Sequence, residues 1–236
     1  MAITQDDVVR TAVRLLDEAG LDGLTLRRLG CELGVSAPTL YWHVRDKRAL
    51  LDLVAEAITA EPSSPLRPAH GQPWWEWLSD GAWGQYRALT SHRDAALIIA
   101  GNRPTQNSLP VIEALIGTLV EVGFPPREAL ESILTIGHFV LGAALEHQAE
   151  AARGTVTEAG APLLAVRLRD AADLPNLVGA MRGGAALDSD ATFRYGLALI
   201  MAGLRARHTE LIQLAHPGRD STGLGEPETR MPMDSA

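Results

Sequence analysis

Residues 25–48 of the chain read TLRRLGCELGVSAPTLYWHVRDKR, and this stretch decides the fold of the N-terminal region. Leucines recur at helical spacing in its first half, Gly34 is placed to end that helix, and Ser36 can cap a second helix that follows at once. A second helix this short can enter the major groove of duplex DNA with its first residues at the base edges. The stretch therefore predicts a helix-turn-helix that binds double-stranded DNA.

Length and composition limit the class of protein. The chain has 236 residues, 46% of them hydrophobic, which is enough for one small domain and a larger one with its own core. Its single cysteine, Cys31, cannot form an internal disulfide, so we expect a buried thiol and a reducing compartment, the cytoplasm. The N-terminus does not resemble a signal peptide, and the longest apolar stretch, residues 133–145, is interrupted by His138 and is too short to cross a bilayer. The sequence thus predicts a soluble protein with no membrane partner.

The net charge of −8 is unevenly distributed along the chain. Residues 1–50 carry seven basic and seven acidic side chains, so the other fourteen basic and twenty-two acidic residues account for the whole deficit. Lys47, close behind the motif, is the only lysine among twenty-one basic residues. Its position can be chance, or its flexible ammonium can act as a point charge on a DNA phosphate. The acidity therefore belongs to the second domain and is compatible with DNA binding by the first.

The rest of the sequence has helical periodicity and almost no strand signal, which predicts an all-α fold. Thr4 and Asp7 form a capping-box pattern at the start of the first helix. The Gly-rich segment at residues 149–162 is expected to be mobile. The predicted helices run from residue 5 to about residue 20, and then over residues 46–60, 74–90, 94–101, 106–122, 126–148, 163–173 and 189–214.

A proline-rich break at residues 61–73 follows the first helices. We expect three units along the chain. They are a helix-turn-helix DNA-binding domain at residues 1–48, a helical ligand-binding and dimerisation domain at residues 49–215, and a disordered tail at residues 216–236.

The N-terminal block resembles the DNA-binding domain of the tetracycline-repressor (TetR) family. The matching residues are Leu33-Gly-Val-Ser-Ala-Pro-Thr-Leu-Tyr-Trp-His-Val44, followed by Asp46-Lys-Arg-Ala-Leu-Leu51. Later blocks are similar to the tetracycline-responsive branch in the same order: Ser91-His-Arg-Asp94, Gly101-Asn-Arg-Pro-Thr105, Gly123-Phe124, and Gly137-His-Phe-Val-Leu-Gly142 with Glu146. The resemblance implies a homodimeric, all-helical repressor that leaves its operator when a small-molecule effector fills the C-terminal domain.

The resemblance also implies which residues contact DNA. They are Thr25, Arg27, Ala37, Pro38, Thr39, Tyr41, Trp42, His43 and Lys47. Arg27 can form two hydrogen bonds with a guanine edge. Ala37 stands where the tetracycline branch has a glutamine, so the operator sequence should differ. Tyr41 and Trp42 have an alternative role, which is packing in the core of the small domain.

The ligand-binding pattern of the tetracycline branch is altered in this chain. That branch binds its drug as a magnesium chelate through a histidine, and Ile99 stands at the matching position here. Gly81, Gln85 and Leu115 replace an asparagine, a phenylalanine and a glutamine. Glu146 remains, but one carboxylate is a poor site for a hard cation. These departures imply that the protein uses no metal and no other cofactor.

Aromatic residues take the place of those polar groups, because four of the five tryptophans lie between Trp74 and Trp83. They can be ordinary core and interface packing, or at least one can line an apolar pocket for a largely hydrophobic or polycyclic ligand. His138 has the same two interpretations, a ligand contact or a core histidine. The candidate ligand-binding residues are Trp74, Trp77, Gln85, Ile99, Asn102, Arg103, Pro104, Leu115, His138 and Glu146.

The helices predicted at residues 126–148 and 189–214 are the candidates for a dimer contact. The first is apolar on nearly every side, so it must be buried on every side. Both contain glycines, among them Gly142 and Gly203, which permit close approach of two backbones. A four-helix bundle between two subunits satisfies both observations and would place two recognition helices one turn apart on a palindromic operator.

Two functions fit this sequence. The first is a ligand-released transcriptional repressor. The second is a DNA-binding regulator without a small-molecule effector, which is constitutive or responds to a protein partner. We do not expect an enzyme, because the sequence contains no Ser-His-Asp signature, metal-ligand cluster or phosphate loop.

Overall fold

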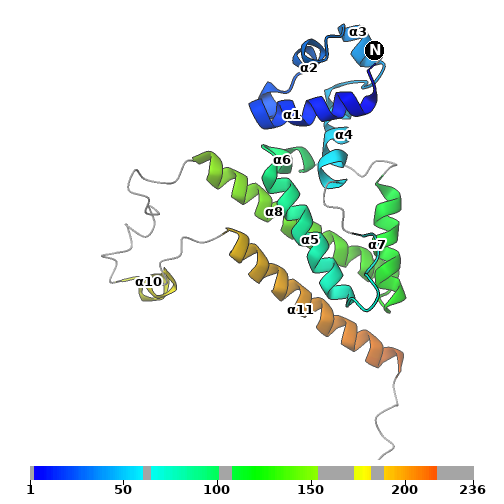
Figure 1. Cartoon of the computed structure of the whole chain (residues 1–236). Coiled ribbons are helices and arrows are strands. Elements are labelled where there is room, and N and C mark those ends of the chain that lie inside the picture. The colour runs from blue at the N-terminus through cyan, green and yellow to red at the C-terminus, as the bar shows by residue number, and fades with distance from the viewer. Residues whose placement is uncertain (1–2, 61–64, 101–107, 154–172, 182–188, 217–236) are drawn as a thin grey trace, which may run out of the picture.

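The computed structural model describes residues 3–60, 65–100, 108–153, 173–181 and 189–216, which form ten helices and no strand (Figure 1). These helices are α1 (Gln5–Gly23), α2 (Leu26–Glu32), α3 (Ala37–Tyr41), α4 (Lys47–Ala60), α5 (Trp74–Ser91), α6 (Ala95–Ile99), α7 (Leu109–Glu121), α8 (Pro126–Arg153), α10 (Pro175–Met181) and α11 (Ser189–Ala215). The predicted all-α fold is confirmed. α1 to α3 lie at one end of the molecule, and α4 joins them to a bundle built around α5 and α8.

The N-terminal domain begins with the capping box predicted at α1. The Thr4 hydroxyl accepts a hydrogen bond from the Asp7 N–H at 3.2 Å, and the Asp7 carboxylate accepts one from the Thr4 N–H at 3.0 Å. The Thr4 hydroxyl also donates to that carboxylate, and these bonds hold the pKa of Asp7 below its ordinary value. The core of the domain is formed by buried apolar side chains of the first four helices: Val8, Ala12, Leu15, Leu16, Leu24, Leu29, Leu40, Val44 and Leu50.

The helix-turn-helix differs from the sequence prediction in two details. Gly34 ends α2 with a φ of +65°, as expected of a glycine, but the Ser36 hydroxyl pairs with the Thr39 hydroxyl at 2.9 Å and caps no backbone amide. Cys31 is exposed, so the predicted buried thiol is wrong. The reason is that Leu29 and Gly30 are the buried residues of this seven-residue helix, and Cys31 lies outside that buried side.

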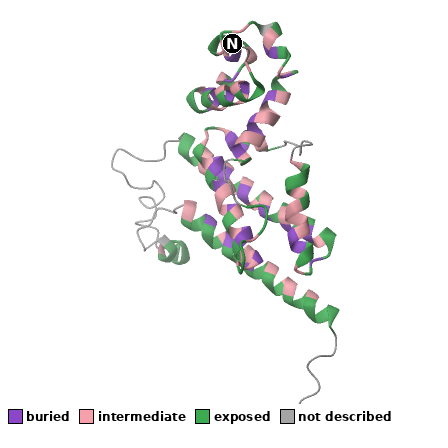
Figure 2. Ribbon diagram, turned by 45° about the vertical axis from the view of Figure 1, so that its right-hand side comes forward, coloured by how far each residue is buried: buried purple, intermediate pink, exposed green. Residues whose placement is uncertain are grey.

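α4 contributes to the cores of both domains. Its start is fixed by a hydrogen bond from the Ala49 N–H to the Asp46 carboxylate at 2.8 Å. This bond, together with one from the Arg45 side chain, lowers the pKa of Asp46. Buried residues then continue from Leu50 to Ile58 along one side of the helix. α4 packs against α1 in the small domain and against α5 and α6 in the larger one, where buried residues concentrate (Figure 2).

An aromatic stack joins α5, α8 and α11 in the larger domain. The ring of Tyr86, which is fully buried, lies 4.1 Å from the ring of Phe193, and Phe139 lies 5.1 Å from Phe193 on α11. Gly196 lets Phe139 approach α11, because a Cβ at this position would lie 2.6 Å from the Phe139 Cζ. A side chain and not a second backbone approaches α11 at Gly196, so this contact is not the close approach of two backbones that the glycines predicted.

Most predicted helices are present with small shifts at their ends. α8 continues to Arg153, so residues 149–153 are helical rather than mobile. This segment reads AEAAR, whose residues favour helix, which explains the extension. α10 was not expected from the sequence. The helix predicted at residues 163–173 and the predicted tail lie almost entirely outside the described residues.

α8 is long and apolar enough to cross a membrane by length and composition alone. The sequence prediction considered only residues 133–145, which is half of this helix. In the structure α5, α6, α7 and α11 pack against α8. Its buried apolar residues belong to the core of the bundle: Ala129, Ile136, Val140 and Ala144. Leu130 and Leu134 are exposed, so within one chain α8 is not buried on every side, contrary to the sequence prediction.

Replacing Gly196 by alanine should destabilise the fold, because the added methyl group would force Phe139 out of the aromatic stack. Overpacking of this kind costs about 1–3 kcal/mol, which a denaturant titration would measure. Gly117→Ala on α7 is the matched control, because a Cβ there meets nothing within 4 Å. The control should be neutral or slightly stabilising, since alanine favours helix over glycine by about 1 kcal/mol. Equal free energies of unfolding for the two variants would contradict the role of Gly196.

Candidate DNA-binding surface and ligand cavity

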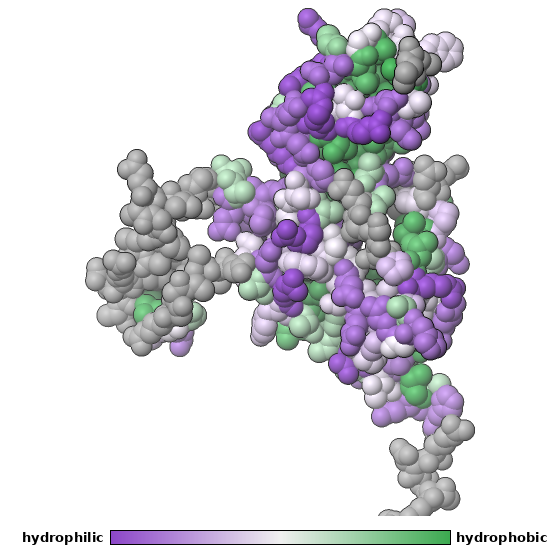
Figure 3. Space-filling view, viewed as in Figure 1, coloured by the Kyte–Doolittle hydropathy of each residue, from purple (hydrophilic) through white to green (hydrophobic). Residues whose placement is uncertain are grey.

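The surface around α3 exposes most of the residues expected to contact DNA. Trp42 is 88% exposed and Tyr41 is 55% exposed, so the alternative that they pack in the core of the small domain is wrong. Figure 3 shows mainly hydrophilic side chains over the neighbouring α1. Thr25, Arg27, Pro38 and Lys47 are also exposed, Thr39 and His43 are half-buried, and the side chain of Ala37 lies outside the described part of the structure.

The basic groups of this surface differ in their partners. Arg45 forms an ion pair with Asp46 at 2.9 Å, whereas Arg27 makes no hydrogen bond or ion pair with any described residue. The Lys47 ammonium donates one hydrogen bond to the Leu21 carbonyl at 3.3 Å, which leaves it further donors for a phosphate. Arg27 thus presents all the donors of its guanidinium, which suits the two bonds that a guanine edge accepts.

The end of α1 connects this surface to the larger domain. The carboxylate of Asp94, which precedes α6, accepts a hydrogen bond from the Leu21 N–H at 2.8 Å. Gly20 has a φ of +70°, and a Cβ on it would lie 2.6 Å from the Asp94 Oδ2. The Leu21 carbonyl accepts from Lys47, so the backbone of this one residue contacts the larger domain through its N–H and the candidate phosphate-binding lysine through its carbonyl.

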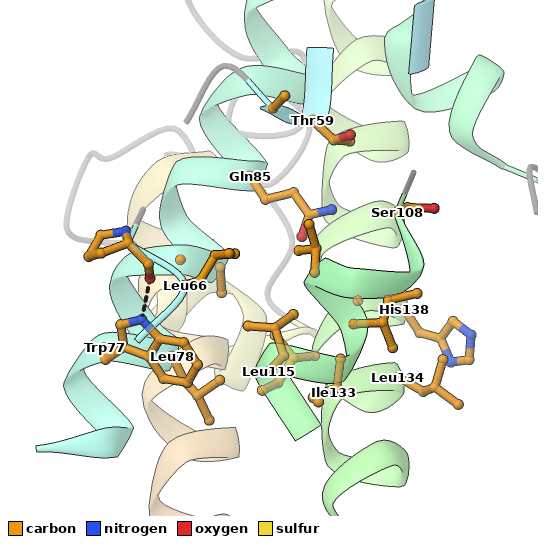
Figure 4. Close-up of a pocket in the computed structure, with 18 of the residues that line it drawn as sticks. Thr59, Leu66, Trp77, Leu78, Gln85, Ser108, Leu115, Ile133, Leu134 and His138 are labelled. Carbon is orange, nitrogen blue, oxygen red and sulfur yellow. Dashed lines mark hydrogen bonds between the residues drawn. The ribbon is translucent and has the colours of Figure 1, made fainter. Parts of the chain in front are cut away.

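A cavity of about 680 Å³ lies between α4, α5, α7 and α8 (Figure 4). Its walls are mainly apolar, with Trp77 and Leu78 on α5 facing Leu115 on α7 and Ile133 on α8. The Trp77 indole N–H donates to the Pro65 carbonyl at 2.7 Å, which fixes the ring in the wall. The polar residues that line the cavity are Glu56, Thr59, Gln85, Ser108 and His138.

The cavity brings together four of the residues expected to bind a ligand: Trp77, Gln85, Leu115 and His138. His138 is exposed at the edge of the cavity, so its interpretation as a core histidine is wrong. Sequence reasoning missed the lining residues from the end of α4, the following segment and the start of α7. They include Thr59, Leu66, Val111 and Ile112. The helical spacing of Val111, Ile112 and Leu115 was the available signal for α7.

The other candidate ligand-binding residues do not line this cavity. Trp74 packs in the core with its ring 5.3 Å from Phe124. Ile99 is half-buried against the core on α6, and Glu146 is exposed on α8. Asn102, Arg103 and Pro104 lie outside the described residues.

The described residues do not fit a bound metal. They contain no group of three His, Cys, Asp or Glu side chains that could hold an ion. Glu56 and His138 line the cavity from different helices, and Ile99 offers no donor atom. A magnesium chelate needs several oxygen ligands in near-octahedral geometry, which these residues do not supply.

α8 and α11, which pack against each other, carry exposed apolar side chains that we call the α8–α11 stripe. Leu134, Tyr195 and Leu199 are 48%, 70% and 57% exposed, and Leu134 also lines the cavity. Figure 2 shows exposed residues along α11. Gly142 and Gly203 are exposed too, and a Cβ on either would meet nothing within 4 Å. Within one chain these two glycines make no close approach. Large exposed apolar side chains on two packed helices are typical of a protein–protein contact.

Two protein-family models match the chain. Residues 8–54 match the family described as bacterial regulatory proteins, tetR family, and residues 67–208 match the tetracyclin repressor-like C-terminal domain. The tetracycline repressor protein class A from transposon 1721 of Escherichia coli is 40% identical over 203 residues, which cover 85% of this chain and 89% of that repressor.

Solved structures with bound ligands are also similar to the chain. ActR from Streptomyces coelicolor in complex with actinorhodin has a TM-score of 0.73 and 34% identity, over 87% of this chain and 97% of ActR. TetR (class A) in complex with 5a,6-anhydrotetracycline and magnesium has a TM-score of 0.63 and 36% identity, over 84% of this chain and 96% of the other.

Arg27→Ala should reduce binding to the operator by about 1–3 kcal/mol and relax the preference at one base pair, because a bidentate base contact is lost. Lys47→Ala should weaken binding to every sequence alike and lower the slope of affinity against salt by about one. Titrations of operator and random duplex at several salt concentrations would measure both effects. If both substitutions weakened the two duplexes equally, Arg27 would not be a base-reading residue.

Proposed function

The chain belongs to the TetR family of ligand-responsive, DNA-binding transcriptional repressors, and we propose that its effector is a small, largely hydrophobic, polycyclic molecule. We propose further that the repressor acts in the cytoplasm as a homodimer on a palindromic operator, without a metal, another cofactor or a membrane partner.

One observation carries this proposal, namely the apolar cavity whose wall includes α4. Its volume of about 680 Å³ is in the range of small-molecule pockets. Glu56 and Thr59 of α4 line the cavity, whereas Leu50 of the same helix is buried among the residues of the DNA-binding domain. An occupant that displaces this wall therefore moves the DNA-binding domain. A regulator without an effector would leave the cavity without a role.

The free energy that such a switch requires can be compared with the apolar surface that a ligand buries in the cavity. Shifting a population from 1:99 to 99:1 requires about 5.5 kcal/mol of difference in affinity between the two states. At about 25 cal/mol per Å², that difference corresponds to about 220 Å² of apolar surface buried in only one of the states. A ligand with several fused rings, packed between Trp77 and Leu115, can bury that much surface, and a small polar ligand cannot.

The chemistry of the wall supports an effector without a metal. The class A tetracycline repressor was solved with magnesium and 5a,6-anhydrotetracycline, whereas ActR was solved with actinorhodin. Ile99 has no donor atom for a metal, and the described residues contain no metal-binding cluster. Both observations favour an effector that contacts the protein directly, without a bridging metal ion.

The α8–α11 stripe supports the homodimer. Two copies that pair through this stripe would bury Leu134, Tyr195 and Leu199 and would bring Gly142 and Gly203 against a neighbouring backbone. Twofold symmetry would then place the two small domains at the same end of the dimer, on opposite sides of the axis, as a palindromic operator requires.

Magnesium–tetracycline should not release this protein from its operator at micromolar concentration, because Ile99 cannot bind the metal and the described residues offer no replacement. The measurement is a gel-shift titration with the drug, with and without EDTA. The class A tetracycline repressor on its own operator is the positive control. Release at micromolar drug that EDTA abolishes would show a working metal site and overturn the metal-free proposal.

Leu199→Glu should convert the dimer to a monomer, because it would bury a carboxylate in an apolar contact without a partner. Sedimentation velocity at micromolar concentration would measure this change. Leu109→Glu on α7 is the matched control, since Leu109 is 54% exposed, close to the 57% of Leu199, but lies outside the stripe. A dimeric Leu199→Glu variant, or a monomeric wild type, would contradict the proposed interface.

A further inference from the structure

Gln85 is the only residue with a side-chain amide among those that line the cavity in the described structure. It projects from α5 into the space between α5 and α7 (Figure 4) and has no hydrogen-bond partner among the described residues. Two other amides of this domain are bonded. Gln72 donates to Asp80 at 2.9 Å, and Gln148 donates to two backbone carbonyls, each at 2.8 Å.

Two other polar side chains of the wall, those of Thr59 and Trp77, donate their hydrogen bonds to backbone carbonyls of the protein. The Thr59 hydroxyl donates to the Ala55 carbonyl at 2.8 Å, and the Trp77 N–H is bonded to the Pro65 carbonyl. His138, at the edge, is exposed. Gln85 therefore brings both a donor and an acceptor into an otherwise mainly apolar cavity.

An amide of this kind is matched by one arrangement of ligand atoms. A glutamine side chain presents a carbonyl acceptor beside an N–H donor. It can therefore form two hydrogen bonds with a ligand whose edge carries a donor beside an acceptor. Enclosing it against a purely apolar ligand would remove water from both groups without replacing the hydrogen bonds, which is unfavourable.

We infer that the effector is an uncharged polycyclic molecule with a hydrogen-bond donor beside an acceptor on one edge, as in a lactam, and that Gln85 binds this edge. The inference rests on the proposed function of the cavity and specifies its ligand. Gln85 is then the residue that determines specificity, while Trp77, Leu78, Leu115 and Ile133 enclose the ring system.

The charges of the wall restrict the ligand further. Glu56 is the only carboxylate that lines the cavity, and no Lys or Arg lines it among the described residues. An anionic ligand would meet the like charge of Glu56 and, among the described residues, no Lys or Arg. Transfer of any charged group into the apolar part of the cavity would also cost its hydration. An uncharged molecule avoids both penalties.

The test compares two probes that differ in one hydrogen-bond donor, phenanthridin-6(5H)-one and its N-methyl derivative. Isothermal titration calorimetry would measure both with the wild-type protein, with Gln85→Leu and with the control Gln72→Leu, whose amide lies outside the cavity. We expect the wild type and the control to bind the lactam about 10- to 100-fold more tightly than the N-methyl compound, since the N-methyl compound loses the N–H donor and leaves the Gln85 carbonyl buried without a partner. Gln85→Leu should bind the two probes within about twofold of each other, because its side chain cannot pair with either.

Several results would overturn the inference. They are equal affinity of the wild type for both probes, discrimination that persists in Gln85→Leu, and no binding of the lactam at its limit of solubility. A melting curve of Gln85→Leu that matches the wild type excludes unfolding as the cause of a loss. A gel shift with the lactam separates the two proposals. Discrimination by Gln85 without operator release would overturn the proposed function of the cavity and leave the ligand class standing.

Discussion

The structure depends on α4 being buried in two cores at once. Its first half packs with α1, and its last turn forms part of the cavity wall, so neither domain can move without this helix. The Asp46 cap fixes where the helix starts, and the Asp94 carboxylate holds the end of α1 against the larger domain. This coupling requires no special mechanism beyond close packing, because a packed helix shifts as a unit when one end is displaced.

The cavity shows how one helical frame can serve different effectors. The helices around it are fixed by contacts outside it, such as the stack of Tyr86, Phe139 and Phe193, none of which lines the cavity. Side chains that face inward are therefore free to change without loss of the fold. In this chain those positions hold mainly apolar residues, and Gln85 is the only side-chain amide that the described residues place there, so the proposed recognition depends on shape and on few polar groups.

The parts of the structure that were predictable from the sequence are those set by neighbouring residues. The capping box at Thr4, the Asp46 cap and the helix-turn-helix depend on residues a few positions apart. Burial depends on which distant helix covers a side chain. There the predicted buried thiol of Cys31 was wrong, and so was one of the two interpretations of His138, the core histidine. The two tryptophans on one face of α5 illustrate the limit. Both are buried, but only Trp77 reaches the cavity, because Phe124 and His208 cover Trp74.

The distribution of tryptophans makes the protein its own optical probe. Trp42 is the only indole of the DNA-binding domain and is surrounded by solvent, whereas the other four lie on α5, with Trp74 and Trp77 buried. Indole fluorescence shifts to longer wavelength in water, so the red side of the emission band comes mainly from α3 and the blue side from α5. Binding of DNA near Trp42 and binding of a ligand beside α5 can thus be followed in one emission spectrum, without a label.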